Sequence, residues 1–436
     1  MIRKYIAASA LAGLTTVFAT PLSAGTVVTD GPDIVVKTKG GLEVATTDEA
    51  FGFKLGGRIQ ADYSTFDGAY TKNGERGDAA YFRRAYLSLS GHAYRDWAYK
   101  LSYDFSHNSG DAENGYFDEA SVTYKGFKPV SIRVGRFGPD FGLESATSSK
   151  WVTATERTAA YDIVDWAGSD GSGLGAQIAS KFGDSARAEA SVLSKGANDG
   201  NGRNSLQFNG RAVFAPFHES GDVLHFGLNL AHRDVSGREF DSRYRTRMGM
   251  RGVATAGGTS AGENGNRPVL GGASKSPAGA YASDSAMGLE AAWAKGPVSL
   301  QAEYIARRTR ADDNAHHDIK GYGYSAQAAY TLTGEARAYK LGEFGQIKPA
   351  NKDIGAWEVF YRFDGLSVRD ENFTTATAQH GLGDTGVKVH NLGVNWYANN
   401  AVKVSAVYAH ALTDNISNAN GDTGGNGIVV RGQYVF

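Results

Sequence analysis

The sequence predicts an all-β fold, namely a single transmembrane antiparallel β-barrel of about 16 strands. Three observations favour this class. The chain opens with the layout of an export signal, stretch after stretch alternates apolar and polar residues with a period of two, and most stretches are about ten residues long. Strands of that length span a bilayer when tilted, and an even strand number is typical of bacterial barrels.

Residues 1–24 are predicted to be a cleaved signal peptide, which leaves 25–436 as the barrel domain. Arg3 and Lys4 form a short positive region, an apolar stretch follows, and cleavage is expected after Ala24. The alternative is an N-terminal membrane anchor, for which the apolar stretch is short and interrupted. A signal peptide followed by a transmembrane barrel indicates export through the periplasm to the bacterial outer membrane.

The composition excludes several classes of protein. Without the signal peptide the chain has 43 Lys and Arg against 46 Asp and Glu, so its overall charge indicates neither an anion binder nor a nucleic-acid binder. Any cationic function must come from where the positive side chains lie. The absence of cysteine excludes disulfides, thiol catalysis and cysteine metal sites. No run of 18 apolar residues follows Ala24, so no transmembrane helix is expected.

The alternation is clear in the stretches 53–65, 402–412 and 428–436. In the first, Ile59 and other apolar side chains alternate with Arg58 and other polar ones. Because a strand points successive side chains to opposite faces, each stretch has one apolar face and one wet face. Gly, Asn and Asp turns join the stretches, and the 22 Tyr, 21 Phe and 6 Trp supply aromatic girdles. The chain ends on a phenylalanine within a strand, as outer-membrane barrels typically do.

A β-sandwich and a soluble β-solenoid are the alternatives to a barrel. Sandwich domains rarely exceed about 250 residues, and the sequence has no fixed repeat period. Closure of the whole chain into one barrel also explains why the composition shows no break.

Two long segments interrupt the strand rhythm, from about Gly138 to Asp170 and from about Arg238 to Ser283. Loops of this length are usually functional or disordered. The second loop is rich in glycine, has few acidic residues and contains Arg238, Arg243, Arg245, Arg247, Arg251 and Arg267. A cationic cluster of this size in a near-neutral protein indicates a local function.

The sequence predicts no enzyme, no cofactor and no metal site. Residues 258–262 match the G-x-S-x-G pattern, but they lie in a glycine-rich loop and not on a strand-to-helix elbow. His316 and His317 are adjacent, so on a strand they would point to opposite faces, and no third ligand is spaced to join them.

Arg58 and Arg84 lie on the wet faces of their strands, which line the lumen of a barrel. Guanidinium groups keep their charge and match phosphate oxygens bidentately. A line of moderate sites conducts anions better than one tight site, because the ion must also leave. For any single arginine the alternative is ordinary wall charge balanced by a nearby Asp or Glu. For Arg58, Arg83, Arg84 and the loop arginines as a set, we favour an anion path.

Several longer runs carry more specific motifs: FKLGGRIQADY (53–63), AYFRRAY (80–86), GYFDEASVTY (115–124), ATSSKWVT (146–153), RMGMRG (247–252), GAWEVFYR (355–362) and NLGVNWY (391–397). Together they closely resemble the phosphate- and pyrophosphate-selective porins O and P, from the signal peptide to Phe436 with few gaps. The resemblance implies a homotrimer of barrels in outer-membrane lipid that takes up phosphate, pyrophosphate or polyphosphate passively. It also implies that the loop after the fifth or sixth strand folds inward to form the constriction.

The resemblance further implies which residues meet the anion. An arginine ladder along the pore would comprise Arg58, Arg83, Arg84, Arg243, Arg245, Arg251 and Arg267. A central site would comprise Tyr86, Asp118, Ser148, Ser149, Lys150 and Arg157. The periplasmic mouth would carry Lys340, Lys348, Lys352 and Lys388. The aspartate at position 118 would accept a hydrogen bond from a protonated phosphate oxygen and disfavour chloride.

The chain departs from the family pattern at four positions. Ser145 stands where the family carries a constriction lysine, Gly138 replaces an aromatic or acidic residue, and Glu49 and Gly386 stand at lysine positions. We therefore expect a wider, less cationic constriction that still favours anions, binds monophosphate weakly and tolerates larger phosphates.

Three other functions are open to such a barrel. It could be a general anion or nutrient porin without strong phosphate selectivity. It could be an adhesive or structural protein that uses the barrel as an anchor, which would need a plugged lumen or a large surface domain. It could be an outer-membrane enzyme, for which the sequence shows no nucleophile and base on convergent strands.

Overall fold

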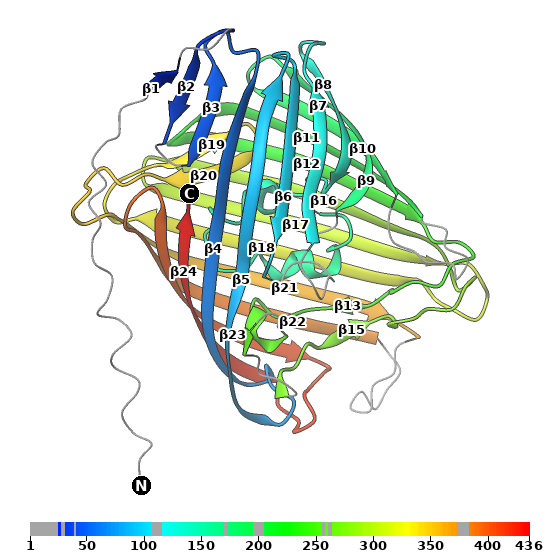
Figure 1. Cartoon of the computed structure of the whole chain (residues 1–436). Helices are drawn as coiled ribbons and strands as arrows, with labels where there is room; N and C mark the ends of the chain where they lie inside the picture. Colours follow the sequence, from blue (N-terminus) through cyan, green and yellow to red (C-terminus); the bar gives the residue numbers. More distant parts are fainter. Residues whose placement is uncertain are drawn as a thin grey trace.

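The computed structural model describes residues 25–27, 31–38, 41–106, 116–168, 172–194, 205–254, 258–259, 264–372 and 383–436. Within these residues, sixteen antiparallel strands form one barrel (Figure 1). They are β4 (Gly52–Gly68), β5 (Gly74–Ala93), β6 (Trp97–Asp104), β7 (Tyr116–Tyr124), β8 (Val130–Phe137), β9 (Gly173–Phe182), β10 (Ala186–Ser194), β11 (Leu206–Glu219), β12 (Asp222–Asp234), β16 (Tyr281–Lys295), β17 (Val298–Ala311), β18 (Ile319–Thr331), β21 (Ala356–Asp370), β22 (Gly383–Tyr397), β23 (Val402–Asp414) and β24 (Gly424–Val435). The expected signal peptide lies outside the described residues and stays a prediction.

The barrel is closed by its first and last strands. Each strand pairs with the next, and β24 pairs with β4 from Gly427 opposite Phe66 to Val435 opposite Arg58. Closure leaves the wall without a free edge. The predicted barrel of about 16 strands is confirmed. Among the described residues, no helix is long and apolar enough to cross a membrane.

Side chains alternate between the lumen and the outer face as predicted. Along β4, Arg58, Gln60 and Asp62 are buried, whereas Ile59 and Tyr63 are exposed on the outer face. The same pattern holds along β23 and β24. The polar face therefore lines the lumen, and the apolar face is left for lipid.

The two ends of the barrel differ in the length of their connections. At the end that contains Phe436, short turns join the strands, including those at Asp96, Gly183 and Asn399. The last residue still exchanges backbone hydrogen bonds with Gly57, at 2.9 and 3.2 Å. Since outer-membrane barrels have short periplasmic turns and long external loops, this end is the periplasmic one.

One periplasmic connection is an exception, because it folds into the lumen as the hairpin β19 (Arg337–Lys340) and β20 (Glu343–Ile347). The Tyr339 hydroxyl lies 2.7 Å from a ring nitrogen of His225 on β12, and Arg211 of β11 donates to the carbonyl of Gly342 at 2.8 Å. The sequence did not predict this hairpin.

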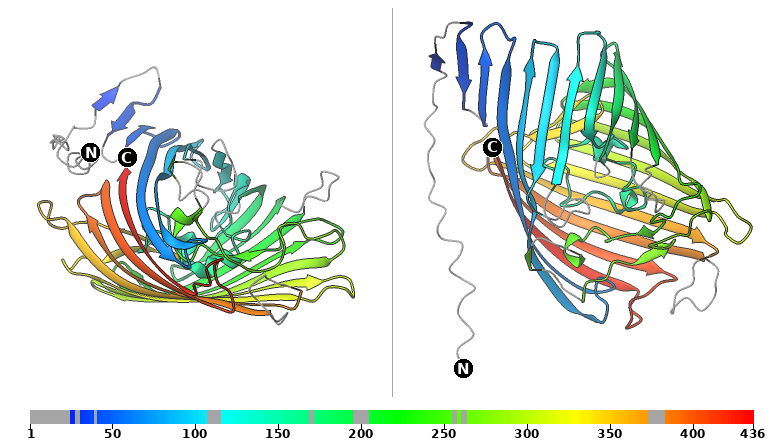
Figure 2. Two further views of the ribbon diagram at one scale, coloured as in Figure 1. Left: turned by 90° about the horizontal axis from the view of Figure 1, so that it is seen from below. Right: turned by 45° about the vertical axis from the view of Figure 1, so that its right-hand side comes forward.

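A small extension precedes the barrel wall. The strands β1 (Gly25–Val27), β2 (Ile34–Lys37) and β3 (Leu42–Thr46) form an antiparallel run, and β3 pairs with the first residues of β4. The right-hand view of Figure 2 shows this extension in blue at the periplasmic end, near the C-terminus. The wall itself begins at Gly52, so 25–51 contribute the extension and the turn that leads into the barrel.

Both long loops fold into the lumen. The first, which we call the constriction loop (138–172), follows the fifth barrel strand and contains α1 (Leu143–Ala146) and η1 (Ala159–Ile163). The second loop (235–280) contains β13 (Tyr244–Arg245), η2 (Arg251–Val253), β14 (Gly258–Thr259) and β15 (Val269–Gly271). The inward fold of the constriction loop is confirmed.

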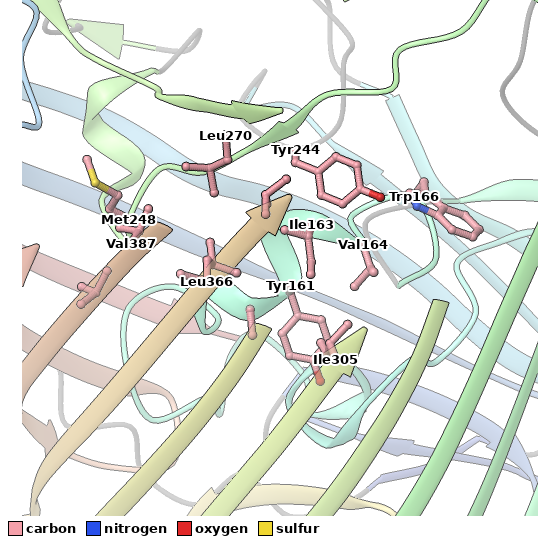
Figure 3. Packing of buried hydrophobic residues seen from close by; sticks show 14 of the residues in the cluster. Tyr161, Ile163, Val164, Trp166, Tyr244, Met248, Leu270, Ile305, Leu366 and Val387 are labelled. Atoms are coloured by element: carbon pink, nitrogen blue, oxygen red, sulfur yellow. The ribbon is translucent and has the colours of Figure 1, made fainter. Parts of the chain in front are cut away.

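The main apolar core lies inside the barrel, where the two loops meet the wall (Figure 3). Tyr161 and Ile163 of the constriction loop and Tyr244 and Leu270 of the second loop belong to one buried cluster with wall residues such as Ile305. This packing fixes both loops at the external half of the lumen, because the apolar surface of each is buried against the other.

Candidate functional site

Two consecutive arginines face the lumen because β5 carries a β-bulge. Gln60 of β4 lies opposite Arg84 and the next residue lies opposite Phe82, so Arg83 is an extra residue in the strand. Phe82 is 53% exposed on the outer face, whereas Arg83 and Arg84 are 5% and 4% exposed. An extra residue shifts the alternation of a strand by one position. Both arginines therefore enter the pore, which a regular strand would not allow.

The central site lies on the inner face of β4 to β7. The guanidinium of Arg58 is stacked 4.1 Å from the ring centre of Tyr86. The Tyr86 hydroxyl donates to Asp118 at 3.3 Å, and Ser102 donates to the second carboxylate oxygen at 3.3 Å. The structure thus brings together three of the predicted ligands and orients the carboxylate of Asp118.

Two glutamines join this wall to the constriction loop. Gln60 lies 3.5 Å from Arg84 Nη1, and its amide nitrogen donates to the Ser149 carbonyl at 3.2 Å and to Gln433 at 2.6 Å. Gln433 donates in turn to the Lys150 carbonyl at 3.2 Å. The segment 148–150 is therefore held beside the arginines of β4 and β5.

Lys150 places an ammonium group near this wall. Burial, together with the nearby cations Arg58, Lys100 and Lys54, lowers the pKa of Lys150 to about 8. The group is still mostly charged at neutral pH and is concentrated with other cations. Ser148 is engaged locally, since its hydroxyl accepts from the Lys150 amide at 3.5 Å.

The second loop continues the positive charge toward the external end. Burial and the neighbouring Arg83 lower the pKa of Arg251 to about 10, so it stays charged at neutral pH. Burial and the neighbours Arg251 and Arg267 lower the pKa of Arg247. Burial and then Arg245 lower that of Arg267. We call Arg58, Arg84, Lys150, Arg247, Arg251 and Arg267 the cationic track.

Three arginines of the predicted ladder are bound to carboxylates. Arg83 donates to both oxygens of Glu156 at 2.7 and 2.9 Å. Arg243 donates to Asp241 at 2.9 Å, and Arg245 lies 3.9 Å from the same carboxylate. They add positive charge beside the cationic track, but the paired carboxylates neutralise part of it.

Many other lumen arginines are paired with buried carboxylates. Arg211 binds Glu290 through two bonds of 2.8 Å, and Arg431 binds Asp62 through two bonds of 2.7 Å. By contrast, neither Arg58 nor Arg84 forms an ion pair with a carboxylate within the described part of the chain: Arg58 stacks on Tyr86, and Arg84 lies 3.5 Å from Gln60. Further pairs are Arg233 and Arg307 with Asp284, Arg337 with Glu358, and Arg362 with Asp364.

Polar side chains of the wall, together with Arg337 of β19, hold the constriction loop by its backbone. Successive carbonyls accept from Gln60 (Ser149), Gln433 (Lys150), Arg337 (Trp151), Lys403 (Val152), Asn395 (Thr153), Arg431 (Thr155), Arg362 (Glu156) and Arg307 (Ile163). These hydrogen bonds fix the backbone of the constriction loop in one position, although the loop has almost no regular secondary structure.

Arg157 braces the constriction loop from within. It donates to the carbonyls of Glu144, Ser145 and Thr147 at 3.1, 3.2 and 3.5 Å. Its predicted role as an anion ligand is not tested by this arrangement and stays a prediction.

Ser145, the departure from the family pattern, lies inside the constriction loop. It is only 4% exposed, its amide donates to the Tyr161 hydroxyl at 3.4 Å, and its side chain lies against Gly168. Beside it, the Glu303 carboxylate of β17 accepts from the backbone of Leu143 at 2.9 Å. The expectation of a wider constriction stays a prediction.

The predicted periplasmic lysines separate into two groups. Lys340, Lys348 and Lys352 are exposed on the connection that carries β19 and β20, at the periplasmic end. The placement of Lys388 there is wrong. Its neighbours Val387 and Val389 are each 1% exposed and face inward, so Lys388 faces outward, and it pairs with Asp414 at 3.1 Å in the external half of the wall.

Sequence reasoning missed several residues at the site. Gln60 and Lys54 share the wet face of β4 with Arg58, so the alternation could have identified both. Gln433 and Lys100 also lie on the wet faces of their strands, but the alternation alone does not show that they come close to Lys150, because their contacts join distant parts of the sequence.

The remaining motifs add no second site in the described residues. No three His, Asp or Glu side chains converge there as a possible metal site. Gly258 and Thr259 form β14 and pair with β5, and the rest of the G-x-S-x-G run lies outside the described residues.

Comparisons with known proteins agree with this geometry. A family model described as phosphate-selective porin O and P matches residues 53–436. Porin O of Pseudomonas aeruginosa is 60% identical over 438 residues and is covered completely, as is this chain.

Solved structures show a likeness of fold. They include the anion-selective porin from Comamonas acidovorans (12% identity, TM-score 0.54, 88% of this chain and 99% of that chain). The outer-membrane channel DcaP of Acinetobacter baumannii is similar too (10% identity, TM-score 0.54, 90% of this chain and 99% of that chain).

Proposed function

Because the chain belongs to the phosphate-selective porin O and P family, we propose that this outer-membrane porin conducts phosphate and its oligomers along the cationic track. The observation that carries the proposal is the contrast between two kinds of arginine in one lumen. Arg211 and Arg431 are paired with carboxylates, whereas Arg58 and Arg84 form no ion pair with a carboxylate within the described residues, so a carboxylate neutralises the charge of the first two and not that of the last two.

Each residue of the central site would have a distinct role. Arg58 and Arg84 would offer guanidinium forks to phosphate oxygens. Lys150 would add a point charge from the constriction loop. Asp118, oriented by two hydroxyl donors, would accept a hydrogen bond only from a protonated oxygen. Chloride carries no proton to donate and would be repelled by the carboxylate.

We further propose that the pore favours pyrophosphate or polyphosphate over monophosphate. Ser145 is uncharged, whereas the family carries a lysine at this position of the constriction loop. The centre of the pore would therefore attract a small anion less strongly than a pore with that lysine. A longer anion spans several cations of the track at once, which increases its residence relative to a single phosphate.

The proposal is tested by single-channel recording in planar bilayers. Chloride current is measured while phosphate or pyrophosphate is added, and we expect block by pyrophosphate at the lower concentration. Arg84→Gln should weaken that block at least about tenfold, since a charge-assisted bond contributes roughly 1.5–3 kcal/mol. Lys295→Gln is the matched control, because it removes one cation from the outer face.

Two outcomes would contradict the proposal. Stronger block by monophosphate than by pyrophosphate would overturn the size preference. Chloride current that neither anion blocks, in the unmodified protein and in Arg84→Gln alike, would favour a general anion porin. In the general-porin case, Ser145→Lys should create phosphate block where none existed.

We also propose that the barrels assemble as a homotrimer in outer-membrane lipid, as the family resemblance implies. Light scattering of the purified protein in detergent would give the number of chains. A mass of one chain would contradict the proposal.

A further inference from the structure

A second β-bulge brings two consecutive carboxylates into the lumen. Ser102 of β6 lies opposite Glu119 of β7, and the next residue of β6 lies opposite Phe117. Asp118 is therefore an extra residue, which shifts the alternation of β7 by one position. Phe117 is 49% exposed on the outer face, whereas Glu119 is 9% exposed. Both carboxylates thus face the lumen, where Asp118 accepts from the hydroxyls of the central site.

Glu119 holds two cations, one from each neighbouring strand. Its carboxylate lies 2.6 Å from the ammonium of Lys100 on β6 and accepts from the guanidinium of Arg133 on β8. The Ser121 hydroxyl donates to the same carboxylate at 2.6 Å. Strands β6, β7 and β8 lie side by side in the wall, as Figure 1 shows. Two cations share one carboxylate, so this group of side chains keeps a net positive charge.

The group lies on the periplasmic side of the central site. Strand β6 starts at a periplasmic turn, and Lys100 lies two residues closer to that turn than Ser102, whose hydroxyl donates to Asp118 at 3.3 Å. Two residues of a strand span about 7 Å. Lys100 is also one of the cations that act on the Lys150 ammonium. An anion that leaves the central site for the periplasm therefore reaches this group next. We call Lys100, Glu119, Ser121 and Arg133 the exit cluster.

Within the exit cluster, Lys100 is the cation that a passing anion can reach. Its side chain is 49% exposed, whereas that of Glu119 is 12% exposed. Arg133 is less accessible, since its guanidinium is stacked 4.3 Å from the ring centre of Phe137. A lysine ammonium is a point charge on a flexible stem, so it can turn from one oxygen ligand to another. The carboxylate of Glu119 and an anion in the lumen are two such ligands.

We propose that Glu119 competes with the conducted anion for Lys100 and thereby speeds the release of the anion into the periplasm. The inference rests on the proposed function of the pore. Lys100 turns to the anion as it leaves the central site, and Glu119 then takes the ammonium back. An ion must bind well enough to enter a pore and weakly enough to leave it. Without the carboxylate, Lys100 would add to the hold that Arg58 and Lys150 already have on the anion.

Single-channel recording of the full-length protein tests the proposal, with pyrophosphate as the blocking anion. The measured quantity is the duration of each block of the chloride current. In Glu119→Gln we expect blocks at least about tenfold longer, since the freed ammonium adds a charge-assisted hydrogen bond to the anion. Block by pyrophosphate added at the external side should begin at an unchanged rate, because the anion meets the central site before the exit cluster.

Two further variants separate the charge of Glu119 from a structural role. Glutamine has the size of glutamate, and its amide oxygen still accepts from Ser121, so Glu119→Gln should fold. Glu119→Asp keeps a carboxylate and should keep the blocks short. The double variant Glu119→Gln with Lys100→Gln removes the freed ammonium and should shorten the blocks again.

Glu189→Gln is the matched control. It removes a lumen carboxylate that is paired with Arg187 on β10 and whose other charged neighbours include Asp140 and Arg211. Because these neighbours are not residues of the cationic track, the duration of the blocks should not change.

Three results would overturn the proposal: blocks of unchanged duration in Glu119→Gln, blocks as long in the double variant as in Glu119→Gln, or equal lengthening in Glu189→Gln. A channel that pyrophosphate does not block in the unmodified protein would instead contradict the proposed function. Failure of the exit cluster and failure of the pore function are therefore separate results.

Discussion

Arg84 and Arg211 both point into the lumen, yet their surroundings give them different functions. Arg211 is bound to Glu290 through two hydrogen bonds in a nearly inaccessible position. Within the described residues, Arg84 forms no ion pair with a carboxylate and lies 3.5 Å from Gln60. The sequence predicts that Arg84 faces the pore, but it does not reveal the partner of either arginine. Glu290 is far from Arg211 along the chain, and only the closed barrel brings them together.

Removal of Arg211 should therefore affect stability more than permeation. Arg211→Gln leaves the buried Glu290 carboxylate without its guanidinium and should cost roughly 3–5 kcal/mol of unfolding free energy. Arg84→Gln leaves no buried carboxylate unpaired and should change stability little. Urea unfolding of both variants in detergent checks the difference. Equal destabilisation would contradict the division into paired and track arginines.

Lys150 should make the conductance depend on pH. Its pKa is lowered to about 8, so the ammonium is charged below that pH and loses its charge as pH rises. Chloride conductance should fall between pH 7 and pH 9, because chloride itself does not titrate. In Lys150→Arg the side chain stays charged, so the conductance should be constant over this range. An identical decline in both proteins would assign the effect to another group.

At the scale of elements, the alternation of the sequence predicts the strands well and the loops poorly. Strands such as β23 and β24 follow a period of two, since one face meets lipid and the other meets polar groups. The bulge at Arg83 breaks that period, and nothing in the local sequence marks it. The hairpin of β19 and β20 was missed for a related reason, because its position depends on contacts with distant strands.

The constriction loop depends most on its acidic anchor. Glu303 accepts from the backbone of Leu143 and Glu144 and from the Tyr161 hydroxyl. Glu303→Ala leaves these buried donors unsatisfied, at roughly 1–3 kcal/mol each. The loop should then move between positions, which single-channel recording would detect as added current noise and weaker anion block.

Asn395→Ala is the matched control for this variant. Among the described loop carbonyls, Asn395 donates to that of Thr153 alone. The hydrogen bonds to the neighbouring carbonyls of Val152 and Thr155 remain. Its channel should stay quiet. A quiet channel in Glu303→Ala would show that the loop does not depend on this carboxylate.

The whole molecule combines a slightly negative chain with a positive path through it. The sequence balance of 45 Lys and Arg against 46 Asp and Glu does not predict this, because pairing determines which charges an ion meets. The closed barrel and the inward loop were predictable from periodicity and resemblance. The site was predictable only in part. Arg58, Tyr86 and Asp118 meet in the central site as expected, whereas Lys388, predicted at the periplasmic mouth, lies in the external half of the wall.

Anion selectivity should therefore depend strongly on salt. The Debye length falls from about 10 Å at 0.1 M to about 3 Å at 1 M, so the field of the cationic track is screened at high salt. Reversal potentials under a potassium chloride gradient should show clear anion preference at low salt and a weaker one at high salt. A preference independent of salt would indicate selection by direct contacts alone.

The paired arginines of the wall also have a consequence for sequence divergence. Arg211 with Glu290 and Arg431 with Asp62 each form a unit, so loss of one member leaves a buried charge. Among relatives, such positions should change together, and an exchange of both for apolar residues should be tolerated. Within the described residues, Arg58 and Arg84 form no ion pair with a carboxylate, so these two positions should vary independently of any acidic position, according to the anion conducted. In related sequences, arginines that change together with an acidic residue should thus mark positions that stabilise the barrel. Arginines that vary independently should mark positions that determine which anion the pore selects.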